Sequence, residues 1–394
     1  MLRRLPTSRL LALLALVLVV LGGGTAIAVA ALNGSGATPP AKPLDAAIHD
    51  AVAAPPVDGV TARITFTNRL IDKSSVGGGS PLLSGATGRL WAAADGRLRL
   101  ELQSDSGDAQ VTSDGKTVTV VDATQNQAYK ITLPKDSGTQ TGGNADTPPT
   151  LARIDEFLRN LAADADVSGA QPSNVAGREA YTVRVSPKHD GGLIGAGELA
   201  WDAANGIPLR AAVYAAGDPR PVLELEATEI TFGKVADSDL SAPVQPGMSV
   251  TNVDLGGQDQ AGAPAGHGKA EPTNDPNSVA KQLPFTLSAP DTLVGLPRKS
   301  VRAITHGDTK AALVTYGAGL GGIAVIEEPA DATAGAPTRS DHGLQLPKIS
   351  IGGTDGQELA TALGTMVRFA RGGVQYTVIG SVPPNAAEAA ARAL

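Results

Sequence analysis

The sequence contains no cysteine and few aromatic residues. Cys numbers 0 and aromatics make up 3% of the 394 residues. Without cysteine the chain has no disulfide, no thiolate nucleophile, no zinc–thiolate site and no N-terminal Cys to carry a lipid. With so few aromatics, a core must be built from Val, Leu, Ile and Ala. Apolar residues still reach 42%, and the length suits two domains of ordinary size.

The charge pattern lacks the basic clusters that nucleic acid requires. The formal net charge is −7, and no long basic run occurs. Binding to nucleic acid needs clustered Lys and Arg that displace counterions from the phosphates. We therefore expect no nucleic-acid partner.

The N-terminus indicates where the chain resides. Arg3, Arg4 and Arg9 precede an uncharged stretch from Leu10 to Leu32. Positive charge stays in the cytoplasm, so residues 45–394 are expected outside the cytoplasmic membrane, with the membrane itself as a partner of residues 1–32. Two interpretations are open. The segment is either a secretory signal peptide, cut after Ala28-Val29-Ala30, or an uncleaved anchor that spans a bilayer core of about 30 Å.

In the first two thirds of the chain, apolar and polar residues often alternate with a period of two. Leu98, Leu100 and Leu102 alternate with charged residues, which predicts a half-buried strand. Asp95-Gly96 before it is a hairpin signal. Similar segments recur up to Phe232, and the apolar phase shifts near residues 228–230, which indicates a bulge. We predict an antiparallel sheet over residues 45–232, preceded by a linker over residues 33–44.

Three other segments depart from this alternating pattern. Leu151, Ile154, Leu158 and Leu161 fall on one stripe and predict an amphipathic helix. Residues 233–280 are rich in Pro, Gly, Asp and Gln and predict a flexible linker. Residues 281–394 predict a smaller α+β domain that ends in a helix at Ala386–Leu394. The fold class is therefore α+β.

Catalytic and cofactor motifs find no support. The five histidines, at positions 49, 189, 267, 306 and 342, lack the spacing of a helical metal site. Gly317–Gly322 contains G-x-G-x-x-G, but the β-branched segment after it favours a glycine hairpin over a nucleotide site. We expect no enzyme activity, no metal and no cofactor. An envelope hydrolase stays an alternative that needs convergent polar residues in a concave site.

Several segments resemble a known family. Gly88–Trp91 leads into Arg97–Leu102, and Leu199–Arg210 contains a strand, an Asp and a Gly-Ile-Pro-Leu-Arg turn. Together, residues 45–232 resemble the LolA-type lipoprotein-carrier superfamily, which includes the first domain of RseB. Gly372–Gly380 and the Ala-rich helix after it resemble the small C-terminal domain of RseB/MucB-like two-domain envelope proteins.

The resemblance implies an unclosed half-barrel whose concave apolar face is covered by helices and binds an acyl chain of a lipid or lipoprotein. Ordinary core packing is the competing interpretation of the same apolar pattern. A second function, a regulatory interaction protein that binds a membrane partner such as an anti-sigma factor, is the alternative. Trp91 has the opposite phase from Leu90 along its strand, so it is not counted on the ligand-binding face. The residues expected on the ligand-binding face are Ile64, Phe66, Leu90, Leu98, Leu100, Leu102 and Leu158.

Overall fold

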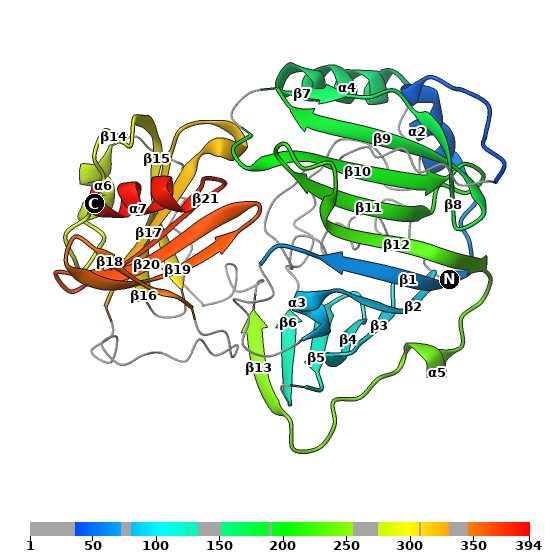
Figure 1. The fold of residues 1–394 in the computed structure, drawn as a ribbon, viewed down its shortest axis with the longest axis horizontal. Helices are drawn as coiled ribbons and strands as arrows, with labels where there is room; N and C mark the ends of the chain where they lie inside the picture. The colour runs from blue at the N-terminus through cyan, green and yellow to red at the C-terminus, as the bar shows by residue number, and fades with distance from the viewer. Residues whose placement is uncertain are drawn as a thin grey trace, which may run out of the picture.

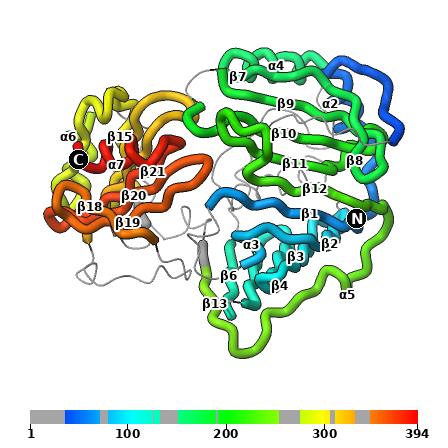
Figure 2. Tube along the Cα trace, in the orientation of Figure 1, coloured from blue at the N-terminus to red at the C-terminus, as the bar shows by residue number. Residues whose placement is uncertain are grey.

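The chain forms two β-sheets with short helices (Figures 1 and 2). The computed structural model describes residues 36–71, 80–124, 126–132, 151–188, 191–254, 275–306, 309–330 and 346–394. Within these ranges no helix combines the length and the apolar character needed to cross a bilayer. The predicted signal or anchor over residues 1–32 lies outside the described residues.

The first sheet contains thirteen strands in the order β13-β6-β5-β4-β3-β2-β1-β12-β11-β10-β9-β7, with β8 paired to β9. It curves from β7 to β13 around an open side (Figure 1). Its strand pairs are antiparallel except that β13 runs parallel to β6. The predicted curved antiparallel sheet is therefore confirmed. The strands are β1 Gly59–Asn68, β2 Ala86–Ala93, β3 Leu98–Ser104, β4 Gly107–Ser113, β5 Thr117–Asp122, β6 Gln127–Thr132, β7 Ala165–Val167, β8 Gln171–Val175, β9 Arg178–Pro187, β10 Ile194–Asp202, β11 Pro208–Ala215, β12 Pro221–Phe232 and β13 Ser249–Asp254.

The alternating pattern gives this sheet one apolar concave face. Leu90 lies opposite Ala62 in β1 and opposite Leu100 in β3. Directly opposed residues share a face, so these side chains join one buried cluster. The register of β1 against β12 shifts between Arg63 and Ile64, where the bulge was predicted. Trp91 lies on the other face beside Leu240, as its phase predicted.

Helices α2 and α3 each cover part of the first sheet. Ala47 and Ile48 of α2 (Leu44–Ala53) pack with Tyr181 and Trp201 of β9 and β10. The short helix α3 (Pro81–Ser84) contacts β1, β3 and β4. The prediction that helices cover this sheet holds for these two elements.

The predicted amphipathic helix exists, but it covers a different surface. It is α4 (Leu151–Asp164), and it packs on α2 and β7 at the edge of the sheet (Figure 1). Ile154 is buried, whereas Phe157 is 63% exposed. Leu158, half-buried there, is therefore separate from the concave cluster.

Part of the predicted flexible linker over residues 233–280 contains regular structure. Helix α5 (Asp237–Leu240) packs on β2 and β3, where Val235 and Leu240 are buried. Strand β13 then pairs with the edge strand β6. A few apolar residues and a free sheet edge thus outweigh the polar composition. Residues 255–274 are outside the described ranges.

The second sheet has the order β14-β15-β16-β17-β21-β20-β19-β18 and is antiparallel. Ala387, Ala390 and Ala391 of α7 (Pro384–Arg392) are buried against it, so the predicted terminal helix is confirmed. Helix α6 (Pro276–Ala280) also packs on this sheet. The strands are β14 Thr292–Leu293, β15 Leu296–His306, β16 Thr309–Tyr316, β17 Ile323–Pro329, β18 Lys348–Ile351, β19 Thr354–Thr361, β20 Gly364–Arg371 and β21 Val374–Gly380.

The glycine-rich segment joins two antiparallel strands of this second sheet. Gly317–Gly322 runs from β16 to β17 and contains the 3-10 turn η2 (Gly319–Gly321). A strand, not a helix, follows it. The prediction of a glycine hairpin is confirmed, and the dinucleotide fingerprint lacks its helix.

Candidate functional site

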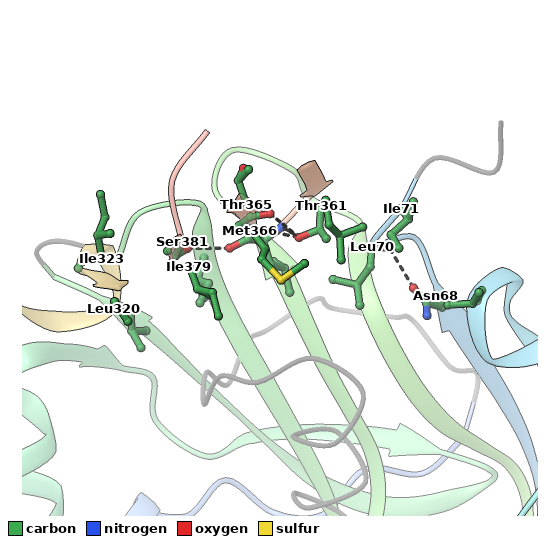
Figure 3. A pocket seen from close by; sticks show the side chains of 18 of the residues that line it. Asn68, Leu70, Ile71, Leu320, Ile323, Thr361, Thr365, Met366, Ile379 and Ser381 are labelled. Carbon is green, nitrogen blue, oxygen red and sulfur yellow. Dashed lines mark hydrogen bonds between the residues drawn. The ribbon is translucent and has the colours of Figure 1, made fainter. Parts of the chain in front are cut away.

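A cavity of about 1080 Å³ lies between the two sheets. This volume is slightly above the usual range for small-molecule sites, about 300–1,000 Å³. Figure 3 shows Met366 and Ile379 side by side in it, with Leu320 on one flank and Leu70 and Ile71 on the other. Its aliphatic lining residues are Leu70, Ile71, Leu82, Leu83, Val120, Ile131, Ile194, Leu320, Ile323, Leu359, Leu363, Met366 and Ile379.

The first wall of the cavity is a continuation of the concave face. The row of opposed residues that contains Leu90 and Leu100 extends through Val111 to Val120 and Tyr129. Val120 and Tyr129 line the cavity. The alternation that makes β1–β4 amphipathic therefore continues into a wall on β5 and β6, where Asp122 and Gln127 add polar groups to the apolar side chains.

The second wall is the face of the second sheet that α7 leaves uncovered. Ala324, Ile379, Met366 and Leu359 lie directly opposite one another on β17, β21, β20 and β19. All four line the cavity, and Ile379 is 41% exposed. Because successive residues of a strand alternate between faces, Val367 and Val378 point instead into the core under α7. This sheet is therefore apolar on both faces along this row.

Two hydrogen-bonded contacts join the sheets at the margin of the cavity. The backbone N–H of Ala362, after β19, donates to the carbonyl of Leu70 at 2.8 Å. The N–H of Leu193, before β10, donates to the carbonyl of Ser381 at 2.9 Å. Leu70 and Ser381 both line the cavity, so its shape depends on how the two sheets are docked.

The residues predicted for the ligand-binding face are mostly gathered, but next to the cavity rather than in its wall. Ile64, Phe66, Leu100 and Leu102 are buried in one cluster, and Leu90 packs against it. Val120, Ile131 and Leu363 belong to or pack on this cluster and also line the cavity. Leu98 is half-buried at the other end of β3, and Leu158 lies on α4. A role of these seven residues in ligand binding stays a prediction.

Sequence reasoning missed the second wall. The available signal was a pair of adjacent apolar residues in a strand, such as Met366-Val367 or Val378-Ile379, which places apolar groups on both faces. No local sequence pattern predicts that Leu70, Leu363 and Ser381 line the cavity. They are brought there by the docking of two sheets whose strands are distant in sequence.

One group of convergent polar side chains bears on the hydrolase alternative. Arg210 of β11 pairs with Glu198 and Glu224 and donates to the Tyr214 hydroxyl at 2.9 Å. Burial alone would lower the pKa of Arg210, but Glu198 and Glu224 outweigh it and raise that pKa. Arg210 and Tyr214 are 4% and 1% exposed. A buried guanidinium that pairs with two carboxylates forms a buried ion-pair network within the sheet.

Metal chemistry has no visible site in the part of the chain that the structure describes. There, no three His, Asp or Glu side chains are grouped so that they could hold an ion. His189, His267 and His342 lie outside the described ranges.

Comparisons with known proteins found similar chains among solved structures only. No protein-family model and no curated protein matches the chain. A structure of MucB in complex with MucA(peri) is 18% identical, with 84% of this chain and 91% of that chain covered, at a TM-score of 0.39. The MucA/MucB complex of Pseudomonas aeruginosa is 19% identical, covering 88% and 94%, also at 0.39. The chain is similar to MucB and to LolA-superfamily proteins. A LolA-superfamily protein of Nitrosomonas europaea is 9% identical, covering 51% of this chain and 99% of its own, at 0.21.

Proposed function

We propose that the chain binds the acyl chain of a lipid or lipoprotein in the cavity between its two sheets, on the outer side of the cytoplasmic membrane. The observation that carries the proposal is an aliphatic cavity of about 1080 Å³ that continues the concave face of the first sheet. The cationic start of the sequence, followed by its uncharged stretch, supports the location.

The binding energy would come from apolar burial. Each methylene removed from water contributes about 0.8 kcal/mol. A chain with about ten buried methylenes therefore gains about 8 kcal/mol before the cost of ordering the ligand and the protein.

A charge placed in the second wall tests the proposal. Ile379→Asp puts a carboxylate among the apolar lining at a position that is already 41% exposed, so the fold tolerates it better than it would a buried charge. We expect at least about tenfold weaker binding of a fluorescent fatty acid, because tenfold corresponds to about 1.4 kcal/mol. Native mass spectrometry of the purified full chain should show bound lipid, and the variant should carry less.

Leu151→Asp is the matched control. Leu151 is 44% exposed and opens α4, away from the cavity. Its substitution introduces the same charge at a similar exposure and should leave binding unchanged. Absence of lipid and of fatty-acid uptake in the unaltered chain would refute the proposal, as would equal losses in the two variants.

A further inference from the structure

The turn between β19 and β20 reaches from the second sheet into the apolar cluster of the first. Leu363 is 9% exposed and belongs to the buried cluster that contains Ile64, Phe66 and Leu102. Ala362 beside it packs on the same cluster. A side chain of the second sheet thus occupies part of the hollow that the first sheet's concave face creates.

This turn is held in place by its own sheet. The Thr361 hydroxyl accepts from the N–H groups of Leu363 and Gly364 at 3.2 and 3.1 Å and donates to the Gly364 carbonyl at 2.8 Å. The Ser381 hydroxyl donates to the Leu363 carbonyl at 2.8 Å. Gly364 approaches the backbone of Gly380 so closely that a Cβ there would lie 2.5 Å from the Gly380 carbonyl oxygen. The position of Leu363 is therefore set by the backbone.

Leu363 also lines the cavity, so it stands where the cavity meets the filled part of the hollow. We propose that Leu363 is a stopper that ends the cavity and so determines how long an acyl chain it accepts. The inference rests on the proposed function and adds a specificity-determining residue to it. Ile64, Phe66 and Leu102 belong to the same buried cluster as Leu363, so an acyl chain that passed this side chain would meet apolar surface.

A smaller residue at this position should lengthen the accepted chain. Leu363→Ala removes about three carbon atoms next to an existing cavity, and such voids collapse only in part. The probes are saturated monoacylglycerols of about 10 to 20 carbons, which displace a fluorescent fatty acid from the full chain. Each added methylene that fits should raise affinity about fourfold until the chain meets the stopper, since fourfold corresponds to about 0.8 kcal/mol. In Leu363→Ala the length limit should move up by about two or three carbons.

Two further variants make the result specific. Leu359→Ala removes the same atoms from the middle of the second wall, outside the cluster, and should leave the length limit unchanged. Leu363→Phe extends the side chain and should shorten the limit, which gives a second test if the smaller variant folds poorly. A limit that is the same in all variants, or a uniform loss of affinity at every length, overturns the stopper alone. No binding of any probe by the unaltered chain overturns the proposed function and the stopper with it.

Discussion

Glu327 is a carboxyl group enclosed by the core of the second sheet. It is 0% exposed and lies opposite Tyr376 on β21. The Ser288 N–H donates to its Oε2 at 2.9 Å, and its Oε1 has no hydrogen-bond partner among the described residues. Burial raises the pKa of Glu327 to about 7, although the bond from Ser288 acts to lower it. An acid in this position is protonated in the folded chain at a pH where it is ionised in the unfolded chain.

The raised pKa predicts that stability falls as pH rises. Below pH 4.5, the pKa of this carboxyl in the unfolded chain, the group is protonated in both the folded and the unfolded state. Its full contribution to stability is then present. Between 4.5 and about 7 the unfolded chain releases the proton first, so the free energy of unfolding should fall by up to about 3 kcal/mol. Glu327→Gln should remove this decline, as measured by urea unfolding at pH 5 and pH 8.

Glu229→Gln is the control for this experiment. The Glu229 side chain is 69% exposed and pairs with Arg63. Its substitution should leave the decline between the two pH values as in the unaltered chain. An undiminished decline in Glu327→Gln would show that another group is responsible.

At the scale of elements, the loop before β10 is shaped for contact with the second sheet. Gly192 has a φ of +60°, and a Cβ on it would lie 1.9 Å from the carbonyl oxygen of Ser381. No residue with a side chain fits between these two backbones without moving them apart. The contact from Leu193 to Ser381 therefore depends on glycine at this position.

Gly192→Ala should loosen the docking of the two sheets. Moving Ser381 away opens the margin of the cavity, so we expect at least about tenfold weaker fatty-acid binding, or about 1.4 kcal/mol. Titration with the fluorescent fatty acid measures the change. Gly192 does not line the cavity, so the loss would come through docking.

Gly217→Ala separates this effect from backbone strain. Gly217 has a φ of +78°, and nothing lies within 4 Å of a Cβ built there. The Gly217→Ala variant should lose stability because alanine disfavours the left-handed conformation, and it should bind the fatty acid as the unaltered chain does. Equal loss of binding in both variants would contradict a docking role for Gly192.

At the scale of the whole molecule, ligand binding and the docking of the two sheets should be coupled. The cavity takes one wall from β5 and β6 and the other from β17 and β19–β21. A ligand that needs both walls binds the docked arrangement and stabilises both sheets.

Calorimetry of the full chain with a fatty acid measures this coupling. At about 100 times its dissociation constant, a ligand stabilises the state it binds by about 2.7 kcal/mol. We expect the unfolding midpoints of both sheets to rise together. A rise confined to one of two separate transitions would show that the ligand uses a single wall.

Local pattern was enough to predict most elements. The alternation around Leu98–Leu102, the hairpin at Asp95-Gly96 and the helix near Ala386 lie where they were expected. These features follow from side-chain periodicity and turn chemistry, which act over a few residues. The concave cluster of Ile64, Phe66 and Leu100 follows for the same reason.

The sequence by itself determined an α+β chain with a one-sided apolar sheet and a basic, then uncharged, start, because composition and periodicity specify which face of each strand avoids water. Tertiary structure decided where the apolar face of the first sheet borders a cavity and where it is filled. Leu363 reaches it from about 300 residues beyond Ile64 in the chain, and Ile379 forms the opposite wall. Such contacts depend on how separately formed sheets dock, which no local pattern encodes.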